Sequence, residues 1–158
     1  AMSLRAQADL ALQAIGANLG TPLALDGQGL AVLDFGDEAR CWLSVSEARD
    51  CITFRCPLVQ VFGSARDRVA EVALRLNLSP GPIATGRIGL IPADSQFVYR
   101  ADLREPPTPD RLAGFLRVAM ECAIEARAQL QAAVRAATDG QTEDELSAFL
   151  SLDAMIRV

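Results

Sequence analysis

The sequence contains no lysine and no histidine, so arginine supplies all 15 basic side chains. Histidine is the usual general acid or base near neutral pH. Lysine is needed for Schiff-base chemistry and for phosphate-binding P-loops. The two absences together argue against an enzyme, and we expect the chain to catalyse no reaction.

Long apolar runs are also missing. No stretch approaches the roughly 18 consecutive apolar residues that a membrane-spanning helix requires. The first five residues, Ala1-Met2-Ser3-Leu4-Arg5, lack the basic region and apolar block of a signal peptide. We therefore expect a cytoplasmic protein without membrane insertion.

The charge balance is acidic, because 20 carboxylates outnumber the 15 arginines and leave a net charge of −5. Affinity for nucleic acid depends on basic side chains that neutralise phosphates, and here the arginines are scattered along the chain. We expect no nucleic-acid partner. Net acidity instead favours cationic partner segments.

The four cysteines follow neither a CxxC spacing nor any other zinc-ligand pattern, and no histidine is available to complete one. In a reducing compartment such thiols are most often small buried hydrophobic residues. We expect no metal and no cofactor. The cysteines are Cys41, Cys51, Cys56 and Cys122.

What the chain does have is apolar content, at 51% of 158 residues, which suffices for one domain with a core. We assign residues 1–139 to this domain and residues 140–158 to a short helix and tail. Apolar spacing predicts helices over 4–19 and from Ser64 to about residue 78, and a long helix from Thr108 to about Ala137. Thr142 and Glu145 form a capping box that predicts the final helix.

Strands are predicted over 30–35, 40–46, 51–58, 87–91 and 96–101, with Pro57 near the end of the third. The fold class is therefore α+β: helix, three-stranded antiparallel meander, helix, two-strand hairpin, long helix and short C-terminal helix. Alternation in the meander places Trp42 on a polar face beside Thr53 and Arg55. Such a tryptophan is either packed under a helix or an anchor for a partner.

Two further motifs are candidates for a catalytic or phosphate-binding site. Asp34, Asp37 and Glu38 cluster in one hairpin turn, where carboxylate catalysis and ordinary turn-forming aspartate are the two interpretations. Gly86-Arg87-Ile88-Gly89 lacks the pattern of a phosphate loop and precedes a strand.

The order of elements, the acidity and several local phrases resemble the class I type III secretion chaperones, the Tir-chaperone-like family. The resemblance spans roughly Leu4 to Ala137. It rests on the meander, the long helix and the phrases Leu74-Arg75-Leu76-Asn77-Leu78, Gly86-Arg87-Ile88-Gly89-Leu90 and Phe97-Val98-Tyr99-Arg100-Ala101.

The resemblance implies a homodimer that binds the N-terminal segment of a secreted effector and keeps it unfolded for export, with the export ATPase as a candidate further partner. The implied effector-binding residues are Leu12, Ile15, Leu30, Val32, Leu33, Trp42 and Phe54. The implied dimer-interface residues are Val72, Leu74, Leu76, Ile88 and Leu90. The alanine-rich centre of the long helix is a second place for dimer contact.

Two alternatives stay open at this point. One is a small-ligand or regulatory binding domain that uses the cleft between sheet and helices. The other is a hydrolase that depends on a carboxylate or a thiol.

Overall fold

The computed structural model describes residues 1–36, 39–79 and 86–139. These residues form three helices and five strands in the predicted order. The predicted final helix, with Thr142 and Glu145, lies outside the described residues. The elements are α1 (Leu4–Leu19), β1 (Leu30–Phe35), β2 (Ala39–Ser46), β3 (Cys51–Gln60), α2 (Ala65–Leu78), β4 (Arg87–Ile91), β5 (Gln96–Leu103) and α3 (Pro109–Asp139).

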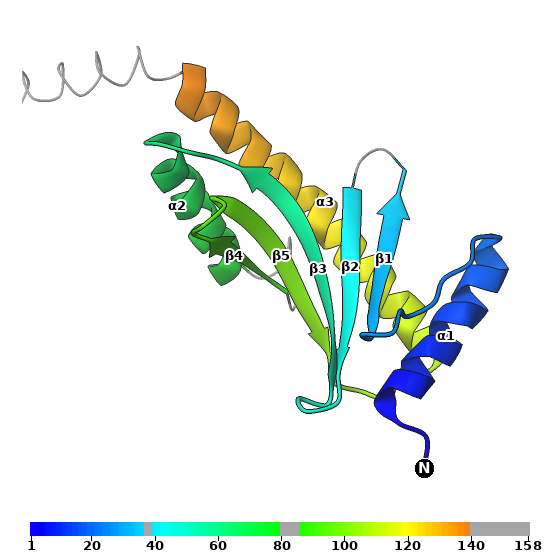
Figure 1. Cartoon of the computed structure of the whole chain (residues 1–158). Coiled ribbons are helices and arrows are strands. Elements are labelled where there is room, and N and C mark those ends of the chain that lie inside the picture. The colour runs from blue at the N-terminus through cyan, green and yellow to red at the C-terminus, as the bar shows by residue number, and fades with distance from the viewer. Residues whose placement is uncertain (37–38, 80–85, 140–158) are drawn as a thin grey trace, which may run out of the picture.

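The five strands make one antiparallel sheet in the order β1-β2-β3-β5-β4 (Figure 1). The meander and the hairpin are confirmed, since β2 pairs with both β1 and β3 and β4 pairs with β5. The pairing of β3 with β5 joins the two units. It brings together residues 36 to 51 positions apart, and no local pattern in the sequence predicts it.

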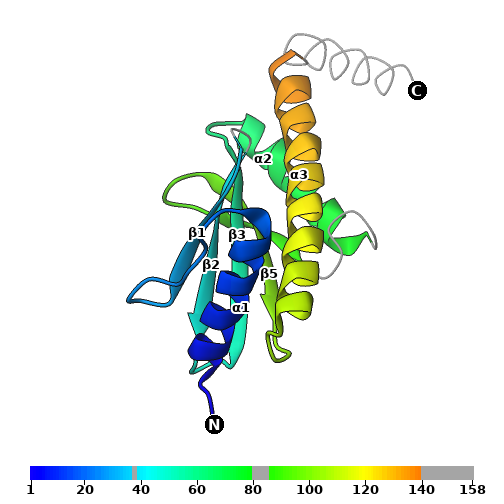
Figure 2. The ribbon, with the colours of Figure 1, turned by 90° about the vertical axis from the view of Figure 1, so that its right-hand side faces the viewer.

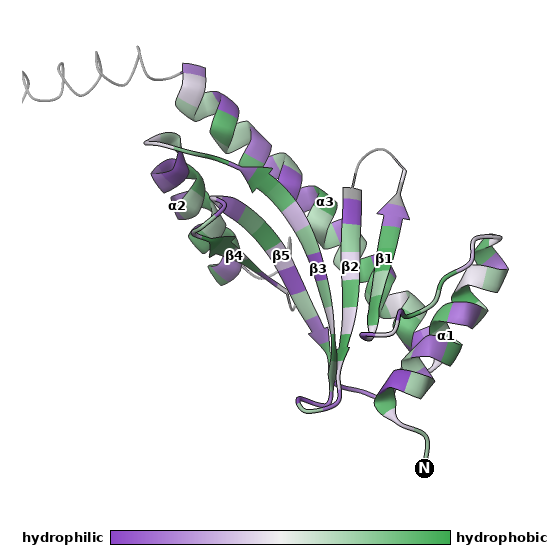
Figure 3. Ribbon diagram, in the orientation of Figure 1, coloured by the Kyte–Doolittle hydropathy of each residue, from purple (hydrophilic) through white to green (hydrophobic). Residues whose placement is uncertain are grey.

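All three helices lie on one side of the sheet, as two perpendicular views show (Figures 1 and 2). Side chains alternate along the strands, and the ribbon coloured by hydropathy changes along them accordingly (Figure 3). The inner face carries apolar residues that are buried against the helices, including Leu43, Phe54 and Tyr99. No described helix covers the opposite, outer face. In the described part of the chain, no helix is long and apolar enough to cross a membrane.

Helix α1 begins and ends where local chemistry dictates. The Ser3 hydroxyl accepts a hydrogen bond from the amide of Ala6 at 3.2 Å, and Gly20 ends the helix in the left-handed conformation at φ 71°. A Cβ on Gly16 would lie 2.5 Å from the carbonyl oxygen of Thr21, so only glycine lets the chain turn back this closely. The returning segment is held by Asp9, whose carboxylate accepts from the Leu25 amide at 2.8 Å.

Helix α3 confirms the predicted long helix that starts at Thr108. The Thr108 hydroxyl accepts from the amide of Arg111 at 3.3 Å, and Pro109 occupies the first helical position. The apolar seam is buried at Leu112, Leu116, Ala119, Ala123, Ala126 and Leu130. The Arg127 guanidinium binds the Pro57 carbonyl and approaches the Cys56 sulfur at 3.5 Å, which ties α3 to β3.

One local prediction was wrong. Pro57 lies inside β3, which runs on to Gln60, and the register with β5 shifts between Pro57 and Val59. A bulge at this point tolerates a residue without an amide N–H. The predicted start of the second helix is confirmed, since Ser64 is the N-cap residue of α2, although its hydroxyl makes no capping hydrogen bond to that helix.

Candidate partner-binding surfaces

The outer face of the sheet collects three of the predicted effector-binding residues. Val32 of β1 is directly opposite Trp42 of β2, and Leu30 follows on the same face two residues away. The Val32 side chain is 47% exposed, while Leu30 and Trp42 are half-buried. Because no described helix packs over this face, Trp42 is accessible and is not a core residue.

Three other predicted effector-binding residues lie in the core instead. Leu12 and Phe54 are 0% exposed and Leu33 is 3% exposed. Leu33 and Phe54 alternate with outward residues, so their side chains point toward the helices and a partner cannot reach them. Leu12 faces the core from α1. Ile15, also on α1, is half-buried at the margin of the core.

The C-terminal end of α1 adds a surface that the sequence reasoning missed. A shallow hollow of about 400 Å³ lies between the last turns of the helix and the returning segment, lined by Gly16, Ala17, Pro22 and Leu23 among others. Leu10 and Leu19 are exposed on the same helix, at 54% and 69%. Leu19 is the last residue of the predicted first helix, and only the structure shows that its side chain is exposed.

The edge of β1 is open along part of its length. Asp26 occupies the first edge position, because its carboxylate accepts from the Leu30 amide at 3.0 Å and its amide donates to the Leu30 carbonyl at 2.8 Å. Backbone groups of an edge strand alternate between the partner strand and the outside. Val32 and Asp34 therefore direct their amides and carbonyls outward, and no described residue pairs with them there.

The edge of β4 differs because α2 covers it. The Asn77 side chain donates to the carbonyl of Ile88 at 2.9 Å and accepts from its amide at 2.7 Å, in the manner of a neighbouring strand. The strand also needs Gly86, where a Cβ would lie 2.2 Å from atoms of the Tyr99 side chain. One edge of the sheet is thus free to pair and the other is partly satisfied.

Helix α2 carries an apolar pair on its solvent side. Leu74 and Leu78 are one helical turn apart and are 65% and 87% exposed, while Val69 and Ala73 face the core. Leu78 was not among the predicted dimer-interface residues. Of the predicted dimer-interface residues, Leu74 is exposed, Val72, Leu76 and Leu90 are half-buried, and Ile88 is buried at 6% exposure.

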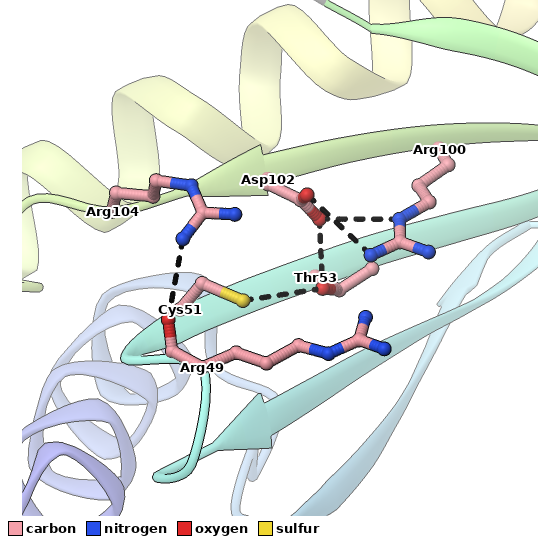
Figure 4. A network of polar contacts seen from close by, with 6 residues as sticks. All are labelled: Arg49, Cys51, Thr53, Arg100, Asp102 and Arg104. Atoms are coloured by element: carbon pink, nitrogen blue, oxygen red, sulfur yellow. Dashed lines mark hydrogen bonds and ion pairs between the residues drawn. The ribbon is translucent and has the colours of Figure 1, made fainter.

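A polar network stabilises the outer face where β3 meets β5 (Figure 4). The Thr53 hydroxyl donates to Asp102 at 2.8 Å, and Arg100 forms an ion pair with the same carboxylate at 3.3 Å. Burial raises the pKa of Asp102, but the hydrogen bond from Thr53 and the charge of Arg100 outweigh it and hold that pKa below its usual value. Arg104 donates to the Arg49 carbonyl nearby.

The cysteines are not placed to act as catalytic nucleophiles. All four are buried and reduced, which confirms the interpretation as core residues. Contacts with Cys41 and Arg127 lower the pKa of the Cys56 thiol despite its burial, as at reactive cysteines. Cys56 is only 1% exposed, however, and no substrate can reach it. The described residues hold no cluster of acidic, cysteine or histidine side chains fit for a metal ion.

A small-ligand binding domain would need an open cleft between the sheet and the helices. In this structure core side chains fill that space. Phe54, Phe97 and Tyr99 of the sheet pack there with Leu112 and Leu130 of α3. Of the acidic cluster, Asp34 forms an exposed ion pair with Arg40 at 2.9 Å, and residues 37 and 38 lie outside the described ranges.

Comparison with known proteins gives one family match and several similar folds. Residues 11–127 match the Tir chaperone protein (CesT) family. A chain of the ExsC–ExsE complex superposes with a TM-score of 0.59 and 18% identity, over 77% of this chain and 92% of that one. No curated protein sequence gives a significant match.

Two other solved structures show the same fold. A chain of the ExoU–SpcU complex, from the type III secretion system of Pseudomonas aeruginosa, has a TM-score of 0.59 and 17% identity, over 79% of this chain and 95% of that one. The structure of the Yersinia pestis type III secretion chaperone SycH with a bound protein fragment has a TM-score of 0.54 and 15% identity, with 73% and 96% covered. These likenesses confirm the predicted chaperone-like α+β fold.

Proposed function

This chain belongs to the Tir chaperone protein (CesT) family of type III secretion chaperones, and on that basis we propose that it is a homodimeric, cytoplasmic chaperone. It binds the N-terminal segment of a secreted effector and keeps that segment unfolded for export. The chain itself catalyses no reaction. The export ATPase is a further partner of the loaded chaperone.

The observation that most supports effector binding is the open edge of β1 next to an uncovered apolar face. An extended peptide that adds to a sheet edge gains backbone hydrogen bonds whatever its sequence. Val32 and Asp34 offer such groups, and Leu30, Val32 and Trp42 offer apolar contacts to the alternate side chains of the same peptide. The hollow at the end of α1 is a second, separate apolar surface for the partner.

Dimer contact fits the opposite side of the molecule. There α2 presents Leu74 and Leu78 on its solvent side, next to the edge of β4. A two-fold interface uses the same patch on both copies, so each exposed leucine is buried twice. Asn77 already hydrogen-bonds to the edge of β4, so an effector peptide can pair more readily with the free edge of β1. The α2 side is then left for apolar contact between the two copies of the dimer.

Substituting Val32 tests the edge directly. Val32→Pro removes the outward amide N–H and no hydrogen bond of the sheet, because that amide faces away from β2. We expect Val32→Pro to weaken binding of the secreted partner about tenfold, from one lost hydrogen bond and the bulk of the ring. The matched control, Val32→Thr, keeps the amide and loses only part of the apolar contact, so it should weaken binding clearly less than Val32→Pro does.

Binding is measured by titration of the purified chaperone with the N-terminal segment of its secreted partner, and folding of each variant by thermal melting. Equal affinity of Val32→Pro and Val32→Thr would show that the β1 edge does not pair with the partner.

A further inference from the structure

Five side chains form an unbroken row across the outer face of the sheet, one from each strand. Val32 is opposite Trp42, and Trp42 is opposite Arg55. Arg55 is opposite Arg100, and Arg100 is opposite Arg87. We call this set the outer row. Its β1 half is apolar and its β4 half consists of three adjacent arginines.

Like charges directly opposite on neighbouring strands destabilise a sheet. Asp102 compensates only Arg100, through the ion pair at 3.3 Å seen in Figure 4. Arg55 and Arg87 are exposed, and no carboxylate among the described residues forms an ion pair with either. The chain has a net charge of −5, so this local excess of positive charge runs against its overall balance and calls for an external anion.

We propose that the outer row binds an acidic, extended stretch of the secreted partner. This inference rests on the proposed function and names the part of the partner that the outer face takes. Carboxylates at alternate positions of the stretch contact Arg55, Arg100 and Arg87, and an apolar side chain beyond them packs on Trp42 and Val32. The net negative charge of the chain as a whole favours cationic partner segments. The three arginines make this face favour an anionic segment instead.

The spacing suits such a peptide. Neighbouring strands lie about 4.8 Å apart, so the three arginines span roughly 10 Å at the backbone. Side chains on one face of an extended peptide recur about every 6.7 Å, so two carboxylates fall within reach of three long guanidinium side chains. Arginine binds carboxylates through two parallel hydrogen bonds, which gives this contact both strength and direction.

Arginine beside a half-buried but accessible tryptophan also suits single-stranded nucleic acid, where bases stack on aromatic rings. A phosphate backbone requires a continuous basic track, and here Asp34 and Asp102 lie on the same face beside the row. The peptide is therefore the occupant that the charges favour, and nucleic acid becomes an outcome of the test.

Trp42 is the single tryptophan of the chain, so its fluorescence reports binding without a label. The probe is a short synthetic peptide with glutamate at two alternate positions and leucine at the next position on the same face, and the control peptide replaces each glutamate with glutamine. We expect a saturable change in emission with the glutamate peptide and at least about tenfold weaker binding of the glutamine peptide.

Two variants locate the site. Arg55→Gln combined with Arg87→Gln should weaken the glutamate peptide about tenfold or more. The control Arg135→Gln, an exposed arginine of α3, should leave the affinity unchanged. Equal binding of both peptides, no response of Trp42, or no effect of the double variant would each overturn the inference. So would oligothymidylate that binds more tightly than the glutamate peptide.

Protection of the secreted partner from proteolysis is measured in parallel. If the unmodified chain protects its partner but the emission of Trp42 does not change with the glutamate peptide, this inference fails and the proposed function stands. If the chain protects no partner, the proposed function fails, and the assignment of the outer row to an effector segment falls with it.

Discussion

The apolar pair on α2 allows a quantitative test of the proposed dimer through the substitution Leu78→Ser. Leu78 is 87% exposed in the single chain, so nearly all of its side chain remains to be buried by a partner. Full burial of a leucine stabilises by about 2 kcal/mol. A two-fold interface buries the residue twice, so the variant should lose about 4 kcal/mol of dimer stability, or roughly a thousandfold in the dimer dissociation constant.

Sedimentation equilibrium over a range of concentrations measures this constant. The matched control is Leu10→Ser, because Leu10 is 54% exposed on α1, away from α2 and β4. It should leave the dimer intact. Both variants should keep the urea midpoint of the single chain, since exposed positions contribute little to folding. A Leu78→Ser dimer as tight as that of the unmodified chain, or a weakened Leu10→Ser dimer, would refute this assignment.

Two further predictions concern the contacts that hold the sheet. Asn77→Ala removes both hydrogen bonds to Ile88 and should cost about 2 kcal/mol, seen as a melting temperature lower by roughly 4–8 °C; an unchanged melting temperature would mean that water replaces the side chain without loss. The lowered pKa of Asp102 means that its stabilising contribution is complete above about pH 4 and is lost as the pH falls through the still lower folded-state value. Asp102→Asn should therefore lose less stability than the unmodified chain between neutral and strongly acidic pH in urea titrations, and an identical acid-induced loss would contradict the pKa direction.

The sequence predicted the elements well where one local pattern decides them. The heptad spacing from Leu112 to Leu130, with Thr108 as cap, predicts α3 correctly because a helix is specified by neighbours three and four residues apart. Strict alternation in β2 likewise placed Trp42 and Leu43 on opposite faces. The final helix, over residues 140–158, stays a prediction.

The candidate site was predicted less well. Val32 and Leu33 were assigned to one binding surface, although adjacent strand residues must face opposite sides of the sheet. Phe54 was placed on the binding surface by the resemblance, while the structure buries it completely in the core. The outer row could not be found from sequence, because it depends on the pairing of β3 with β5 across a long separation. The alternation along each strand predicts which face of the sheet a side chain is on, but it does not predict which strands lie next to each other.

Hydrogen exchange on the complex of this chain with the N-terminal segment of its secreted partner tests the central claim most directly. The amides of Val32 and Asp34 are open in the free chain and should become protected when the partner adds to the β1 edge. The bound segment should stay extended, without the slowly exchanging core of a folded domain. Unchanged exchange at both amides, or a partner segment that folds independently on the chaperone, would contradict the account.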